Sequence, residues 1–106
     1  MNNVTNRDKQ LDALDEHLAA HVAELFSIFS DTSRVRLIAV LAQGEQNVGT
    51  LAQAINLSES AVSHHLRVLR QTRMVQGRRD GRQVFYKLDP HVAELLHQGL
   101  DHLQNG

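Results

Sequence analysis

The chain of 106 residues has no cysteine, no tryptophan and a single proline. Without cysteine there can be no disulfide, no thiol redox sensor and no thiolate metal ligand, so histidine and carboxylate side chains are the only strong metal ligands available. No apolar run approaches the roughly 20 residues of a membrane span, and the polar N-terminus is unlike a signal peptide. We therefore expect a cytoplasmic protein with one domain over residues 1–106 and no membrane partner.

Enzyme motifs are also missing. Ser63, His64 and Asp80 do not have the spacing of a catalytic triad, and the chain has no glycine-rich phosphate loop and no catalytic pair of carboxylates. We predict that the protein is not an enzyme.

Charge is distributed unevenly along the chain. The net charge is −1, yet residues 58–87 carry seven basic and two acidic side chains, which gives that segment a charge of +5. Residues 1–31 and 88–106 are acidic, with charges of −4 and −3. A basic block of this kind indicates a nucleic-acid contact that the overall charge conceals.

Residues 9–29 are predicted to form one helix that serves as a dimer interface. Apolar residues recur there at steps of three and four, the pattern of a packing stripe: Leu11, Leu14, Leu18, Val22, Leu25 and Phe29. His17 and His21 stand four residues apart on this helix, a spacing that can hold a metal. Such a pair without a third ligand is more often simply solvated.

Residues 47–72 are predicted to form a helix-turn-helix. Asp31 can cap the helix before it, Asn47 can cap its first helix, and Ser58 can cap the second. On that second helix Val62, Leu66 and Leu69 share the face that would be buried. The opposite face carries side chains that can contact base edges and phosphates: Ser60, Ser63, His64 and Arg67. The alternative is the solvated face of an ordinary amphipathic helix.

Residues 74–88 are predicted to form a β-wing. The apolar period changes there from 3.6 to 2, and Asp80-Gly81 is a strong signal for a two-residue hairpin turn. Arg78, Arg79 and Arg82 flank that turn and can neutralise phosphates or enter a minor groove. Charged hairpin tips also occur for solubility alone, but solubility does not explain why this hairpin directly follows the helix-turn-helix.

Residues 90–104 are predicted to form the last helix, which has an apolar stripe and bears His91 and His102. Eleven residues place these two histidines within about 20° around the helix but about 16.5 Å apart along it. Two nitrogens on one zinc ion cannot be more than about 4 Å apart. Only an antiparallel copy of the helix could bring Asp89 and His91 to the partner's His102. Histidines at helix ends also act as caps or surface groups, so spacing alone leaves the metal site open.

Several of these segments resemble the ArsR/SmtB metalloregulators over residues 22–104. The resemblance lies in FSDTSRVRLIAVL, LSESAVSHHLRVLR, RRDGRQVFYKL and LDPHVAELL followed by LDHLQ. It implies a mostly α-helical winged helix-turn-helix with a small β-hairpin, in the order ααααββα, and a homodimer. It also implies DNA contacts by the second helix of the helix-turn-helix and by the wing.

The resemblance further implies a metal site shared between subunits at the last helix. Asp89, His91 and His102 match three of the family's ligands, whereas Asn105 stands at the fourth position, so the fourth ligand would be Asn105 or water. The family's other site uses cysteines, including one where this chain has Asn47, and is therefore absent.

The expected function is that of a dimeric repressor that leaves double-stranded operator DNA when zinc binds, with cobalt or nickel as alternative metals. Because Asn105 departs from the pattern, a repressor that answers to a non-metal signal is the alternative. A metal-binding or interaction module without DNA function is a further one.

Overall fold

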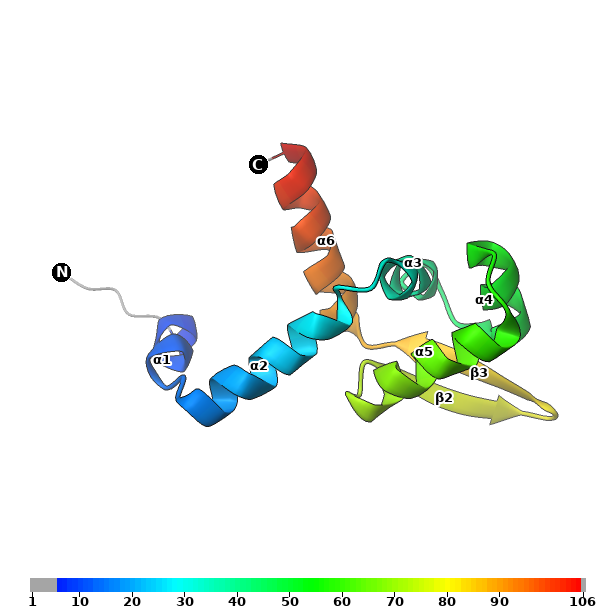
Figure 1. Ribbon diagram of the computed structural model, residues 1–106, viewed down its shortest axis with the longest axis horizontal. Helices are drawn as coiled ribbons and strands as arrows, with labels where there is room; N and C mark the ends of the chain where they lie inside the picture. The colour runs from blue at the N-terminus through cyan, green and yellow to red at the C-terminus, as the bar shows by residue number, and fades with distance from the viewer. Residues whose placement is uncertain (1–5, 106) are drawn as a thin grey trace.

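The computed structural model describes residues 6–105, which form six helices and a three-stranded antiparallel sheet with the strand order β1-β3-β2 (Figure 1). The elements are α1 (Asn6–Asp12), α2 (Glu16–Ile28), α3 (Thr32–Leu41), β1 (Gln46–Asn47), α4 (Val48–Ile55), α5 (Glu59–Gln71), β2 (Val75–Asp80), β3 (Gln83–Leu88) and α6 (Pro90–Asn105). Helices α4 and α5 form the helix-turn-helix and β2–β3 the wing. The predicted winged helix-turn-helix is confirmed.

The prediction of one helix over residues 9–29 was wrong, because the chain breaks between α1 and α2. Asp15 has an extended backbone and caps α2, its carboxylate accepting a hydrogen bond of 2.8 Å from the Leu18 N–H. The apolar stripe runs through the break with the same spacing on both sides. Aspartate is a favoured N-cap residue, but the regular apolar spacing indicated one continuous helix, so the cap at Asp15 was not predicted.

Three predicted caps set the start of the next three helices. The side chains of Asp31, Asn47 and Ser58 each accept a hydrogen bond from the N–H three residues further on, at 3.0, 2.8 and 3.0 Å. Each bond satisfies one of the amides that a first helical turn leaves unpaired. The turn between α4 and α5 follows from these caps and from Asn56, whose left-handed backbone (φ 56°) ends α4.

The core is built from the end of α2, from α3, α4 and α5, from the base of the wing and from the first turn of α6. Its residues are Ile28, Leu37, Ile38, Leu41, Leu51, Ala52, Ile55, Val62, Leu66, Leu69, Met74, Val75, Leu88 and Val92. Helix α5 contributes the three residues predicted for its buried face, and all three are at most 1% exposed. The core therefore fixes which face of α5 points to solvent.

The wing turns one residue later than predicted. Asp80 pairs with Gln83, so the two-residue loop is Gly81-Arg82 rather than Asp80-Gly81. Gly81 has a φ of +65°, the conformation that this loop requires at its first position and that glycine adopts without strain. As a result Arg82 lies at the tip of the wing, whereas Arg78 and Arg79 lie within β2.

Helices α1, α2 and α6 project from this body (Figure 1). The radius of gyration is 16.2 Å, against about 13 Å for a compact domain of this length. The projecting helices and the break between α1 and α2 expose most of their large apolar side chains: Leu11, Leu14, Leu18, Val22, Phe26, Leu95, Leu100 and Leu103. Among residues 6–105 no helix is both long enough and apolar enough to cross a membrane.

Candidate DNA-binding surface and metal ligands

The candidate DNA-reading residues lie on the solvent face of α5. Ser60, Ser63, His64 and Arg67 are all exposed, and they point away from the buried Val62–Leu66–Leu69 face. Within the part of the chain that the structure describes, Arg67 forms no ion pair. Hydroxyl, imidazole and guanidinium groups are thus presented together by one rigid helix.

The tip of the wing and the start of α5 lie on the same side of the molecule. A groove runs between them, lined by Asn47, Val48, Gly49, Glu59, Arg82, Gln83, Val84 and Tyr86. Arg82 at the tip is exposed and forms no ion pair with any residue from 6 to 105. A duplex lying along α5 could therefore also meet the wing tip.

Arg78 and Arg79 project from opposite faces of β2, because successive side chains of a strand alternate. Arg79 shares its face with the buried Val75, and no ion pair holds it within the described chain. Arg78 shares its face with Phe85 and stacks on that ring at 5.2 Å. Arg78 and Arg79 therefore point to opposite faces of the wing, and a duplex lying against one face would not meet both in the same way.

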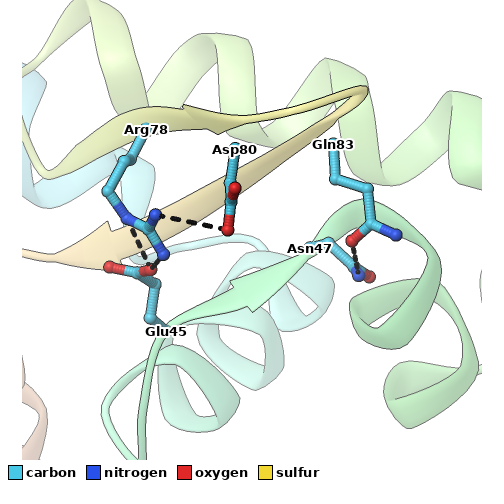
Figure 2. Close-up of polar contacts among 5 residues, drawn as sticks. All are labelled: Glu45, Asn47, Arg78, Asp80 and Gln83. Carbon is cyan, nitrogen blue, oxygen red and sulfur yellow. Dashed lines mark hydrogen bonds and ion pairs between the residues drawn. The ribbon is translucent and has the colours of Figure 1, made fainter.

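Arg78 is held by Glu45, from the segment before β1 (Figure 2). Its Nε donates to Glu45 Oε1 at 2.9 Å, and its Nη2 donates to the same oxygen. The hydrogen bond and the charge of Glu45 raise the pKa of Arg78 above its usual value. Sequence reasoning missed this pair, because Glu45 and Arg78 lie 33 residues apart and no periodicity joins them.

A second contact missed by the sequence joins α3 to α5. Arg34 Nε donates to His65 Nδ1 at 3.1 Å, which requires a neutral imidazole with Nδ1 as acceptor. Burial lowers the pKa of His65, against the opposing charge of Asp31. His65 thus serves as a link between helices, unlike its exposed neighbour His64.

The structure brings together two of the predicted metal ligands. Asp89 Oδ1 accepts from the His91 backbone N–H at 2.7 Å and lies 3.1 Å from His91 Nδ1. The His91 side chain is 96% exposed. His102 is also exposed, further along α6. The residues from 6 to 105 of a single chain contain no group of three histidine or carboxylate side chains that could hold a metal ion.

Two further sets of side chains contain potential metal ligands: Asn105 with Asp101, and His17 with His21. Asn105, at the proposed fourth position, donates its amide to Asp101 Oδ1 at 2.9 Å, which leaves its own carbonyl oxygen toward solvent as an acceptor. The rings of His17 and His21 lie 4.5 Å apart on α2. Neither set completes a group of three potential ligands within the described chain.

Known proteins match both the helix-turn-helix and most of the chain. Residues 31–76 match the family model "Bacterial regulatory protein, arsR family". The "Transcriptional repressor SmtB homolog" of Synechocystis sp. is 48% identical over 99 residues, covering 92% of this chain and 75% of that protein. The chain belongs to the ArsR family.

Two further comparisons agree with this ArsR-family membership. The HTH-type transcriptional regulator NmtR of Mycobacterium tuberculosis is 40% identical, over 96% of this chain and 86% of its own. The solution structure of apo-NmtR has a TM-score of 0.73 at 42% identity, covering 88% of this chain and 82% of that one. The protein is therefore a transcriptional repressor of the ArsR/SmtB type, whose members typically respond to metals, and not an enzyme.

Proposed function

We propose that the protein is a homodimeric repressor that leaves its operator when a transition metal, zinc in the first place, binds at α6. The observation that carries the proposal is the exposed Asp89–His91 pair, which stands at one end of α6 while His102 stands near the other. One chain offers an incomplete ligand set at each end, and a two-fold antiparallel partner would complete both sets.

Imidazole nitrogen and carboxylate oxygen are ligands that zinc accepts in proteins. Asp89 and His91 of one chain with His102 of the other would hold the ion, and Asn105 or water would take the fourth position. Bound zinc would link the two subunits at a defined separation. Cobalt and nickel also bind imidazole and carboxylate ligands and are the metals to compare.

A short route of backbone hydrogen bonds runs from the metal-ligand residues to the recognition helix. The Asp89 N–H donates to the Met74 carbonyl at 2.9 Å, and the Met74 N–H donates to the Leu69 carbonyl in the last turns of α5 at 2.8 Å. A displacement of the start of α6 would therefore be transmitted through these two hydrogen bonds to the end of α5. This contact supports coupling between metal binding and the placement of the two recognition helices.

The proposed DNA contacts are Ser60, Ser63, His64 and Arg67 in the major groove, with Arg79 and Arg82 of the wing on phosphates or in the minor groove. Arg78 is excluded from this set because Glu45 holds its guanidinium group. Operator DNA with two-fold symmetry would match the symmetry of the dimer.

Neutralising Arg79 and Arg82 with glutamine is expected to make the salt dependence of DNA binding shallower. Each phosphate contact that is lost should reduce the slope of log K against log salt by up to about 0.9. Fluorescence anisotropy with a labelled operator over a salt series measures the slope. Lys87→Gln, an exposed cation on the half of β3 away from the tip, is the control. An unchanged slope would show that the wing does not touch DNA.

Replacing Ser63 or His64 with alanine is expected to weaken operator binding far more than binding to unrelated DNA. A lost base contact costs on the order of 1 kcal/mol or more, which is about fivefold per half-site and about thirtyfold for a dimer. The measurement is the ratio of the two dissociation constants at one salt concentration. Equal losses on both duplexes would argue against base reading by α5.

The proposal as a whole is tested by titrating the operator complex with zinc, cobalt and nickel, with magnesium as a hard-cation control. Release of DNA by one of the first three metals supports it. Retention of DNA in the presence of every metal would favour the second candidate, a repressor that answers to a non-metal signal. The observation that favours this second candidate is Asn105 itself, because its amide oxygen is a weaker zinc ligand than the imidazole or carboxylate expected at the fourth position.

A further inference from the structure

The three residues 45–47 touch the wing at two separate points (Figure 2). Glu45 binds Arg78 on β2, as described above. Asn47 Nδ2 donates to Gln83 Oε1, at the tip end of β3, at 3.0 Å. The segment thus reaches both strands of the hairpin, although β1 is hydrogen-bonded only to β3.

The sheet register places all of these contacts on one face. Arg78 pairs with Phe85, Phe85 pairs with Asn47, and Asp80 pairs with Gln83. Directly paired residues of antiparallel strands share a face, as do residues two apart along a strand. Figure 2 shows Glu45 and Asn47 reaching from one side toward Arg78 and Gln83 on this face.

Asn47 joins the wing to the helix-turn-helix by using both ends of its amide. Its Oδ1 accepts from the Thr50 N–H and caps α4, while its Nδ2 holds Gln83. Helix α4 packs against α5, and its Leu51 and Ile55 belong to the same buried cluster as Val62 and Leu66 of α5. The hairpin is therefore tied to the same rigid body that orients the recognition helix.

The contacts of Arg78 are those of a side chain that links β2 to the segment of residues 45–47, not those of a side chain that is free to bind a phosphate. Glu45 neutralises the charge of Arg78 and accepts from two of its nitrogens. Asp80 Oδ2 lies 3.8 Å from Arg78 Nη1, and the guanidinium group lies over the Phe85 ring. A phosphate would have to compete with the carboxylate of Glu45 for this guanidinium group. Arg79 and Arg82 carry no such cost within the described chain.

We propose that Glu45 and Asn47 form a brace that sets the position of the wing relative to α5, and that Arg78 is a positioning residue rather than a DNA contact. The role rests on the proposed contact of the wing with DNA. Without the brace, the hairpin would sample positions in which Arg82 misses the duplex. Operator affinity would then fall although the number of phosphate contacts in the productive complex stays the same.

The sign of the effect of Glu45→Gln separates the two roles of Arg78. If Arg78 contacts DNA, removing an acidic competitor strengthens binding. If Glu45 braces the wing, the same change weakens binding, by up to about fivefold per wing, the upper end of what a single surface pair contributes, and thus by up to about twenty-five-fold for a dimer with two wings. Arg78→Lys, which keeps the charge but loses the forked donors, should weaken binding equally. The salt slope should not change for either variant.

A double-mutant cycle measures the coupling. The protein with both Glu45→Gln and Arg78→Gln should bind operator no more weakly than either single variant, because each change removes the same contact. At the second point of the brace, Asn47→Ser keeps a good helix cap but removes the amide donor to Gln83. It should show the same kind of loss as Gln83→Met.

Three readouts decide the outcome in the proposed dimer: operator affinity, salt slope and amide hydrogen exchange over residues 78–85. The brace predicts weaker affinity, an unchanged slope and faster exchange in the hairpin. Stronger or unchanged binding by Glu45→Gln, or a shallower slope for Arg78→Gln, would overturn it. The Arg82→Gln variant tests the proposed wing contact separately, since only that contact predicts that its slope becomes shallower.

Discussion

Replacing Leu18 and Val22 with glutamate is expected to produce a folded monomer that binds its operator 10²- to 10⁴-fold more weakly, the range that linking two binding modules typically contributes. Both side chains are already partly exposed in the single chain, at 44% and 38%. The substitution should therefore leave the core around α3–α5 intact. What it removes is the apolar stripe of α2 that would face the partner in the proposed dimer.

The size of the effect follows from how a dimer binds two half-sites. Once one recognition helix is bound, the second meets its half-site at a high effective concentration, and a monomer loses this advantage entirely. Two charges in an apolar interface without partners cost several kcal/mol, more than a small dimer interface can absorb. Sedimentation velocity gives the oligomeric state, and anisotropy with full and half operators gives the affinities.

The matched control is Ala20→Glu. Ala20 is exposed on α2 and lies about 200° around the helix from Leu18, so the substitution places a glutamate on the opposite face of the same helix. It should remain a dimer with nearly unchanged operator affinity. If the Leu18→Glu, Val22→Glu protein stayed dimeric at low micromolar concentration with full affinity, the stripe would have to serve another purpose, and the proposed interface would be wrong.

The parts of the fold that the sequence predicted are those decided by local chemistry. The caps at Asp31, Asn47 and Ser58 need only a side-chain oxygen and an amide three residues away. The two faces of α5 follow from a repeat of 3.6 residues, since burial of Leu66 and its neighbours forces Ser63, His64 and Arg67 outward. The alternation of Val84 and Tyr86 in β3 is likewise a local pattern.

The features that the sequence missed depend on contacts between distant residues, or on a cap hidden within a regular pattern. The two-residue strand β1 is too short to show any period and exists because β3 lies beside it. The pairs Glu45–Arg78 and Arg34–His65 join residues more than 30 apart. The break at Asp15 was lost in a continuous apolar stripe. The sequence prediction grouped Arg78 with Arg79 and Arg82 because all three are charged. The register of β2 places Arg78 on the opposite face from Arg79.

The proposed metal site needs ligands from two chains, so its decisive test combines two different chains in one dimer. The His91→Ala and His102→Ala homodimers should each lose both sites, because every site needs both residues. The loss in zinc affinity should exceed the 10- to 100-fold that removal of an outer-shell partner of a ligand typically costs. His97→Ala is the control, since His97 is exposed on the same helix and outside the proposed ligand set.

A heterodimer of the two variants should regain one intact site, which joins the wild-type His91 of one chain to the wild-type His102 of the other. Differently tagged chains allow its purification, and zinc competition against a chelating dye should count one site per heterodimer and two per wild-type dimer. A site confined to one chain predicts no recovery, because each chain of the heterodimer lacks one histidine. Asn105→His should tighten binding by supplying a fourth strong ligand, whereas Asn105→Ala should change little if water fills that position.

Linkage adds a requirement that the metal site must also meet. If zinc lowers operator affinity by a given factor, operator DNA must lower zinc affinity by the same factor, because both measure one coupling free energy. The heterodimer, with one site, should show a smaller zinc-induced loss of operator affinity than the wild type, and the two alanine homodimers should show none. If zinc still released DNA from both homodimers, the inducer would bind elsewhere. Asp89, His91 and His102 would then be surface groups at the ends of a dimerisation helix.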